Sequence, residues 1–527
     1  MLRKYIPNGF NLLVVLFVAL GSTACSYGMA IIGSTIGQPS FYTSLDLAPQ
    51  GKPGYSRTAE FIGAFNGVNC AGSAIGAAVC SWSADKFGRK RTIQFASIIL
   101  IIGTAICAGS VNNGMFMAGR IINGLGIGAL VTVIPIYQAE VSTPESRGFM
   151  VSMHGIMFAM GYTLSAWLGF GVYFISASGS PSSFPWRFPI AFQMAPALLL
   201  LIGSPWLPYS PRWLMAQNRE EEAHEVLINL HRVKEDPYDI MARKEFYQMK
   251  KQVELDRQIK ATTSKFELFK TAPNRRRALV GFLLMWNNQF TGVLIIANYG
   301  VILYMALGMG GYMPLLLSAL WVTSTFPGNI LCAFFVEKVG RRPFLLTGLC
   351  GILVCLICET ALQAEFLGTS NRAGQNAAIF FIFLFITPFW STFMDACQFL
   401  YVAEIFPTHI RSQGSAFSMV GLYLADIIIL VAGPIALNNI SWKFFFVLIV
   451  PTFFHILFVY FFCPETKGRS LEDINAQFGE KVAIHYYGAT EEEKKELEQA
   501  VVEDESAQGD SPAVQGKTGV VERVESA

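Results

Sequence analysis

Charged residues are scarce in this chain. Asp, Glu, Lys and Arg together make up 14% of its 527 residues, while apolar residues make up 53%. A soluble domain has about 25% charged residues, so this shortage argues against a soluble globular protein. The formal net charge is only +2, which gives no reason to expect a nucleic-acid partner.

Cysteine and histidine are also few, with ten and six residues respectively. Most of the cysteines lie inside apolar stretches, where cysteine packs as a small residue. Cys355 and Cys358 form a C-x-x-C pattern within such a stretch, so we interpret them as packing residues rather than a redox or metal site. No metal-ligand cluster, no nucleophile with a base and no cofactor loop stands out. We therefore expect no metal, no cofactor and no enzyme activity.

Long apolar runs, in contrast, are abundant. Each run has about the 20 residues that a helix needs to cross a hydrocarbon core of about 30 Å. Backbone polar groups must be paired within lipid, so runs of this length are predicted to be helices. The first run competes with a signal-peptide interpretation, but its length and the runs that follow favour a membrane span. The twelve runs lie at about 12–32, 60–82, 92–111, 116–138, 150–175, 188–208, 278–306, 312–335, 344–366, 377–402, 414–437 and 442–463.

Basic residues gather on alternate connections between these runs. The positive-inside rule places loops rich in Lys and Arg in the cytosol. It therefore predicts that the even-numbered connections and both termini are cytosolic. The basic residues of the even-numbered connections are Lys86, Arg89, Lys90, Arg91, Arg147, Arg212, Arg275, Arg276, Arg277, Lys338, Arg341, Arg342 and Arg411.

Three short motifs occur twice, in the same order. The pattern D/E-K-x-G-R-[RK] occupies 85–90 and again 337–342. Tyr137, Glu140 and Arg147 have the same spacing as Tyr401, Glu404 and Arg411, and a Pro-rich motif at 208–212 corresponds to 464–468. Such a duplication predicts an all-α integral membrane protein of two six-helix bundles, the arrangement of transporters that rock around a central site.

The duplication also predicts the domain organisation. We expect bundles at 1–208 and 278–463, a cytoplasmic helical linker at 209–277 and a largely disordered cytoplasmic tail at 464–527. In the linker, an apolar stripe at helical spacing follows three glutamates and favours short helices packed under the bundle, although a solvated linker is the alternative. The stripe consists of Ala223, Val226, Leu227 and Leu230.

The repeated loops predict ion pairs at the cytoplasmic ends of the helices. Pairing of Arg89 with Glu140, and of Arg341 with Glu404, would hold these ends together when they are partly buried. We interpret the pairs as latches of the outward-facing state; simple positive-inside topology is the alternative. The predicted gating set is Asp85, Arg89, Glu140, Arg147, Glu337, Arg341, Glu404 and Arg411.

These motifs carry a family resemblance. The R-x-x-x-G-x-G pattern at 120–126, the P-x-Y-x-x-E pattern at 135–140 and the motifs at 208–214 and 464–472 resemble the sugar porter family of the major facilitator superfamily, and its fungal branch in particular. The resemblance covers about residues 15–475. It implies a major facilitator fold of twelve helices, a substrate site between the halves and alternating access.

The resemblance also implies substrate-binding positions, and several differ here from the family pattern. The seventh run reads NQFTGVL at 288–294, where the family has Q-Q-x-[ST]-G-I-N. His154 stands in place of a glutamine, while Phe399 and Tyr423 stand in place of tryptophans. For the polar members, hydrogen bonding between helices is the alternative role. The predicted substrate-binding set is Gln289, Asn288, Asn298, Tyr299, His154, Phe399 and Tyr423.

The first run lacks the acid that proton-coupled members of the family often carry. The chain has Gly28 at that position. Other ionisable residues lie within the runs, namely His154, Glu359, Asp395 and Asp426, and such residues are costly in a membrane unless they have a function. Asp426 is the deepest and is our candidate for proton coupling, with a polar anchor between helices as the alternative.

These observations predict transport of a monosaccharide or related polyol across the plasma membrane, by a facilitator or a proton symporter. The expected partners are the small-molecule substrate, protons if transport is coupled, and the lipid bilayer. Two alternatives stay open: a carrier of a disaccharide or a quinate-like cyclic polyol acid, and a sensor that binds sugar without transporting it.

Overall fold

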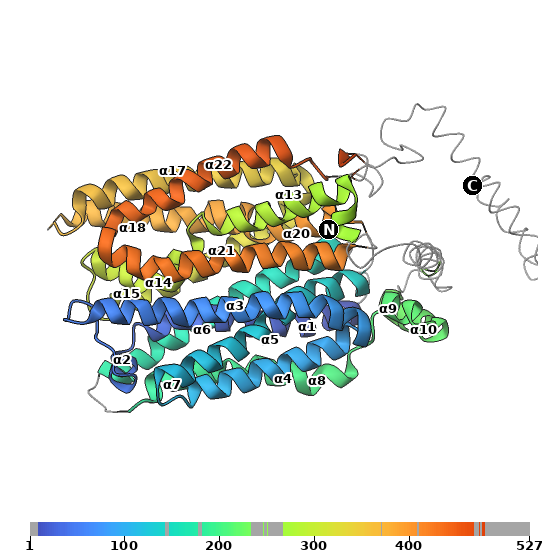
Figure 1. Ribbon diagram of the computed structural model, residues 1–527, viewed down its shortest axis with the longest axis horizontal. Helices are drawn as coiled ribbons and strands as arrows, with labels where there is room; N and C mark the ends of the chain where they lie inside the picture. The colour runs from blue at the N-terminus through green and yellow to red at the C-terminus, as the bar shows by residue number, and fades with distance from the viewer. Residues whose placement is uncertain are drawn as a thin grey trace, which may run out of the picture. The chain divides into compact units, whose positions relative to one another are not determined.

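The structure is a computed structural model. It describes residues 9–142, 147–177, 182–232, 246, 250, 267–369, 371–407, 410–467, 474 and 477–479. Met1–Lys467 and Gly468–Ala527 form two separate compact units, and every helix of the bundle belongs to the first. Within the described residues, all regular elements are helices, and Figure 1 shows the long ones lying side by side.

The first six predicted spans form helices close to the expected boundaries. The sixth span is broken between α7 and α8 at Gln193, after a proline inside α7. The spans are α1 Gly9–Thr35, α3 Tyr55–Phe87, α4 Arg89–Ala108, α5 Asn113–Val141, α6 Arg147–Ala177, and α7 Phe184–Phe192 with α8 Met194–Gly203.

The last six spans are more often broken. The seventh is interrupted at Gly292, whose φ of +93° is a left-handed conformation that glycine adopts without strain. The tenth contains a π-helical turn, a feature often found at functional sites. The spans are α13 Ala272–Gln289 with α14 Val293–Ala306, α15 Met313–Thr323 with α16 Thr325–Val339, α17 Arg341–Phe366, α18 Arg372–Leu384 with the π turn Phe385–Trp390, α19 Ser391–Phe393 and α20 Asp395–Ile405, then α21 Arg411–Ile440 and α22 Phe446–Phe462.

By length and composition, eleven stretches of the described residues can cross a membrane, and the last of them is long enough for two spans. Gln413–Phe462 is 50 residues long. At 1.5 Å per residue it would extend about 75 Å, far more than a hydrocarbon core of about 30 Å. A 3-10 turn at Ser441–Phe445 divides it into α21 and α22, and Ser441 has a φ of +51°. The described residues thus supply the twelve predicted spans.

Glycines allow neighbouring spans to approach closely. A Cβ atom on Gly128 of α5 would lie 1.9 Å from the backbone oxygen of Ser73 in α3. A Cβ atom on Gly76 of α3 would lie 2.2 Å from the backbone oxygen of Leu125 in α5. Small residues serve the same purpose in membrane helix pairs generally, because dispersion contacts replace the hydrophobic effect there.

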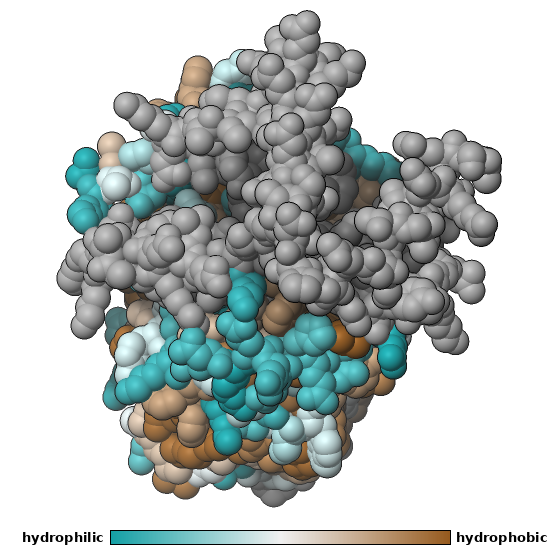
Figure 2. All heavy atoms as spheres, turned by 90° about the vertical axis from the view of Figure 1, so that its right-hand side faces the viewer, coloured by the Kyte–Doolittle hydropathy of each residue, from teal (hydrophilic) through white to brown (hydrophobic). Residues whose placement is uncertain are grey.

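The repeated loops at 85–91 and 337–342 define what we call the basic end of the bundle. Helices α9 (Pro211–Ala216) and α10 (Glu220–His231) lie at this end, on the right of Figure 1, and the short helix α2 (Pro39–Ser44) lies at the opposite end. The predicted stripe packs in a small core, in which Ala223 and Leu227 contact Leu214 and Met215. Figure 2 looks onto the basic end, where hydrophilic side chains gather and apolar ones lie below them.

Candidate functional site

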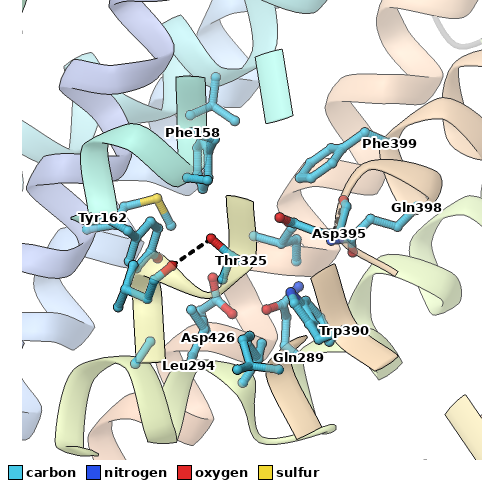
Figure 3. A pocket seen from close by; sticks show the side chains of 18 of the residues that line it. Phe158, Tyr162, Gln289, Leu294, Thr325, Trp390, Asp395, Gln398, Phe399 and Asp426 are labelled. Carbon is cyan, nitrogen blue, oxygen red and sulfur yellow. Dashed lines mark hydrogen bonds between the residues drawn. The ribbon is translucent and has the colours of Figure 1, made fainter. Parts of the chain in front are cut away.

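A central cavity lies between helices of the two halves. Figure 3 shows side chains from both halves pointing into it, with Phe158 and Tyr162 on one side and Trp390, Gln398 and Phe399 on the other. Its wall is mostly apolar and aromatic, which suits the apolar face of a small ligand. The described lining residues are Met29, Val131, Phe158, Ala159, Tyr162, Gln289, Val293, Leu294, Ala297, Trp321, Val322, Thr325, Ile386, Trp390, Asp395, Gln398, Phe399, Met419, Leu422, Tyr423 and Asp426.

The break in the seventh span positions Gln289 at this cavity. Gln289 is the last residue of α13, and the left-handed Gly292 starts the next helix in a new direction. The neighbouring Asn288 does not line the cavity, because its amide nitrogen donates to the side-chain oxygen of Gln398 over 2.8 Å. Asn288 therefore supports Gln398, which does line it.

Two carboxylates face the cavity. Asp395, at the start of α20, is partly exposed and accepts a hydrogen bond of 3.0 Å from the amide nitrogen of Asn329 in α16. Asp426, in the middle of α21, is completely buried, and neither of its oxygens has a hydrogen-bond partner among the described residues. Burying an unpaired charge is expensive, so Asp426 is best accommodated with a bound proton in this conformation.

His154 lies beside the cavity and not in its wall. One ring nitrogen, Nδ1, is 2.8 Å from the hydroxyl of Ser22 in α1, and the ring packs edge-on against Phe399 with centroids 6.0 Å apart. His154 thus joins α6 to α1 and orients the aromatic ring of Phe399, which faces the cavity.

Two residues of the predicted substrate-binding set lie away from the cavity. Asn298 donates to the backbone oxygen of Leu294 in its own helix over 3.2 Å. Tyr299 donates to the backbone oxygen of Leu430 over 2.7 Å and accepts a bond of 2.9 Å from Asn66. The amide nitrogen of Asn298 is thus used within α14 and the hydroxyl of Tyr299 between helices, and neither residue lines the cavity.

Arg120 is a buried residue that the sequence did not connect with the site. Its guanidinium donates to the backbone oxygen of Gly28 over 2.9 Å, to the backbone oxygen of Phe65 over 3.3 Å and to the side-chain oxygen of Asn66 over 3.2 Å. The backbone oxygen of Gly28 thus accepts a hydrogen bond from Arg120. This is the position at which the family resemblance implies an acid in proton-coupled members. The chain from Arg120 through Asn66 and Tyr299 to Leu430 joins the two halves.

Further contacts between the halves lie towards the end opposite the basic loops. A Cβ atom on Gly33 of α1 would lie 2.9 Å from the backbone oxygen of Ala297 in α14. The indole of Trp167 in α6 donates to Thr323 of α15 over 2.9 Å. Together with the bond between Asn66 and Tyr299, these contacts join the two halves at that end.

Both ion pairs that the repeated loops suggest are present at the basic end. The Arg89 guanidinium lies 2.9 Å from Glu140 and 3.3 Å from Asp85. Arg341 binds both oxygens of Glu404, at 3.1 and 2.7 Å. Both arginines are largely buried, so these pairs are more than exposed surface contacts.

Each pair lies within one half, and the latch role of the pairs stays a prediction. Arg89 and Glu140 belong to α4 and α5, both in the first half, and Arg341 and Glu404 belong to α17 and α20, both in the second. Each pair therefore fixes the spans of one half and by itself does not join the two halves. Arg411 donates to the backbone oxygen of Phe406 over 3.2 Å. The side chains of Arg147 and Glu337 lie outside the described part of the structure.

The second and third repeated motifs meet in the same way in each half. The hydroxyl of Tyr137 donates to the backbone oxygen of Pro208 over 2.8 Å, and that of Tyr401 donates to Pro464 over 3.0 Å. In the second half, the carboxylate of Glu465 also accepts from the backbone nitrogens of Arg341 and Arg342, at 2.9 and 3.0 Å. An acid at the start of α17 is favourable for its helix dipole.

Comparison with known proteins gives the same result as the motifs. The sequence profile of the family described as "Sugar (and other) transporter" matches residues 14–478. The chain is similar to the sugar transporter STL1 of Saccharomyces cerevisiae, with 31% identity over 75% of this chain and 68% of that one. It is also similar to a probable quinate permease of Aspergillus fumigatus, with 28% identity over 90% of this chain and 88% of that one.

The fold is similar to that of a solved transporter. The proton:xylose symporter XylE matches with a TM-score of 0.74 and 23% identity, covering 89% of this chain and all of that one. This likeness confirms the major facilitator fold that the sequence predicted. The profile match spans most of the chain, and with it the expected family is confirmed: this protein is an integral membrane protein that belongs to the sugar (and other) transporter family of the major facilitator superfamily.

Proposed function

We propose that this protein carries a sugar, a monosaccharide or related polyol, across a membrane by alternating access. The observation that supports it most is the central cavity, in which the amide of Gln289 lies among aromatic faces supplied by both halves. Amides bind hydroxyl groups as donors and acceptors, and aromatic rings cover the apolar face of a sugar. The residues 1–208 and 278–463 act as the two moving bundles.

The orientation follows from charge. The basic end faces the cytosol, with both termini on that side, because Lys and Arg gather on the connections there. We further propose that this membrane is the plasma membrane.

Proton coupling is assigned to Asp426. It is a buried carboxyl group that lacks a hydrogen-bond partner among the described residues and lies at the cavity between moving helices. A group of this kind binds a proton when water is excluded and releases it when water enters, which couples protonation to the conformational change. The missing acid at Gly28 does not then preclude symport, because the acid is supplied by span eleven.

A cyclic polyol acid is the second candidate, since a relative is named as a quinate permease. The two carboxylates at the cavity weigh against it. A sugar sensor that does not transport is the third candidate. The repeated motifs are intact in both halves, which weighs against a sensor.

The test is uptake of labelled hexoses into liposomes that contain the purified protein, with and without an inside-alkaline pH gradient. We expect uptake of a hexose and its accumulation with the gradient. Asp426→Asn should retain counterflow exchange but lose gradient-driven accumulation. Glu359→Gln is the matched control, because it neutralises another buried carboxylate in α17 outside the cavity wall. Absence of all hexose uptake would contradict transport of hexoses, and accumulation by Asp426→Asn would contradict its coupling role.

A further inference from the structure

The cavity wall has an unbalanced charge. Two carboxylates, Asp395 and Asp426, line it, and no lysine, arginine or histidine is among the described residues that do so. A buried carboxylate normally faces a cation or several donors. Arg120, a buried cation in the neighbouring half, donates to Gly28, Phe65 and Asn66, as shown above, and is not part of the wall.

The two carboxylates differ in what they offer to a ligand. Asp426 lines the cavity, but both of its carboxylate oxygens are buried, so they offer little surface to a bulky group. Asp395 is partly exposed, and Figure 3 shows it between Gln398 and the centre of the cavity. The amide of Asn329 holds one of its oxygens at 3.0 Å, which fixes the orientation of the carboxylate.

The aromatic residues around Asp395 add to this preference. Phe158, Tyr162, Trp390 and Phe399 present ring faces and edges to the same cavity. A cation near an aromatic face is attracted by the negative centre of the ring, whereas an anion is repelled. An amine on a ligand would therefore be favoured by Asp395 and by each ring that turns its face to it, whereas a carboxylate would be disfavoured by Asp395.

We infer that Asp395 selects substrates by charge: the cavity prefers polyols that bear a protonated amine over neutral ones, and excludes polyols that bear a carboxylate. This inference rests on the proposed function and specifies its substrate class. It also predicts that this protein differs from its relative named as a quinate permease.

Competition experiments test it. Uptake of a labelled neutral hexose is measured at about pH 6, where amino sugars are protonated and sugar acids are ionised. Unlabelled glucosamine, glucose and glucuronate are the competitors. For the wild type, glucosamine should inhibit at a concentration at least about tenfold lower than glucuronate, with glucose between them. In Asp395→Asn, the ratio between glucosamine and glucuronate should fall close to one.

Controls separate this inference from the proposed function. Glu359→Gln, which removes a buried carboxylate outside the cavity, should keep the wild-type order of competitors. Equal inhibition by glucuronate and glucosamine in the wild type, or an unchanged ratio in Asp395→Asn, would overturn the inference while hexose transport stands. If no hexose is transported, the proposed function fails. Binding of glucosamine and glucuronate, measured as ligand-induced shifts of Tm for wild type and Asp395→Asn, then still decides the charge preference.

Should Asp395→Asn fail to fold, Asn329→Ala serves as the second variant. It leaves the carboxylate but removes the amide that orients it. The ratio between glucosamine and glucuronate should then decrease by a smaller factor than in Asp395→Asn but stay above one, and a ratio equal to that of the wild type would contradict the inferred role of Asp395.

Discussion

The side-chain amide of Asn66 donates to the hydroxyl of Tyr299 over 2.9 Å, and this bond joins the two halves of the bundle. The hydroxyl of Tyr299 in turn donates to the backbone oxygen of Leu430 over 2.7 Å, and Arg120 donates to the side-chain oxygen of Asn66. Asn66 of α3 and Leu430 of α21 thus meet at one hydroxyl, and Arg120 of α5 supports Asn66. The bond is a polar link between the halves at the end opposite the basic loops.

Removing the hydroxyl of Tyr299 should weaken the contact between the halves at the end opposite the basic loops. Tyr299→Phe loses two hydrogen bonds and leaves the amide of Asn66 and the carbonyl of Leu430 buried, which costs about 1–3 kcal/mol. We expect a lower Tm in detergent and greater labelling of a cysteine introduced on the opposite end. Tyr304→Phe is the matched control, because its buried hydroxyl has no partner among the described residues. Equal effects of the two substitutions would argue against the link.

The bend at Gly292 gives a second prediction. Gly292→Ala adds a methyl group at a φ of +93°, where it also meets Leu448 at 2.7 Å. The left-handed conformation alone costs about 1–2 kcal/mol for a residue with a Cβ atom. Because the bend positions Gln289, we expect hexose uptake to fall at least tenfold, together with Tm. Gly300→Ala, in the regular part of α14, should have little effect, and if it impaired uptake equally the bend would not be the cause.

The ion pairs at the basic end give a third prediction. Glu404→Gln leaves the largely buried Arg341 without its bidentate carboxylate, and we expect a loss of about 1–3 kcal/mol after allowance for the partial exposure of Glu404. Asp85→Asn, at an exposed carboxylate beside Arg89, should cost less than about 1 kcal/mol. Thermal unfolding of both variants measures the difference. If Glu404→Gln instead left Tm unchanged but altered which side of the cavity is accessible, the pair would act between the halves after all.

The twelve spans could be predicted from the sequence, because a membrane imposes one length and one composition on each of them. The pairing of Arg89 with Glu140 and of Arg341 with Glu404 could be inferred as well, since the same motif occurs in both halves. That each pair stays within one half could not, because spacing along the chain does not say which helices pack together.

The cavity wall was harder to foresee. Gln289, Phe399 and Tyr423 of the predicted substrate-binding set lie in it, and so does Asp426. Asn298 instead bonds within its own helix and Tyr299 bonds to another. The aromatic residues Phe158, Tyr162 and Trp390 were missed, because an aromatic residue in an apolar run gives no sign of whether it faces lipid, a helix or a cavity. The role of Arg120 depends on contacts with two other spans, α1 and α3, and it too could not be predicted from its own motif.

The most direct test of the account is counterflow of a labelled hexose in liposomes with Gln289→Leu beside Gln363→Leu. Both substitutions remove a buried amide from the second half, but only Gln289 lines the cavity. We predict that Gln289→Leu lowers counterflow at least tenfold with Tm nearly unchanged, while Gln363→Leu retains most of the wild-type rate. Wild-type counterflow in Gln289→Leu would contradict the assignment of the central cavity as the sugar site.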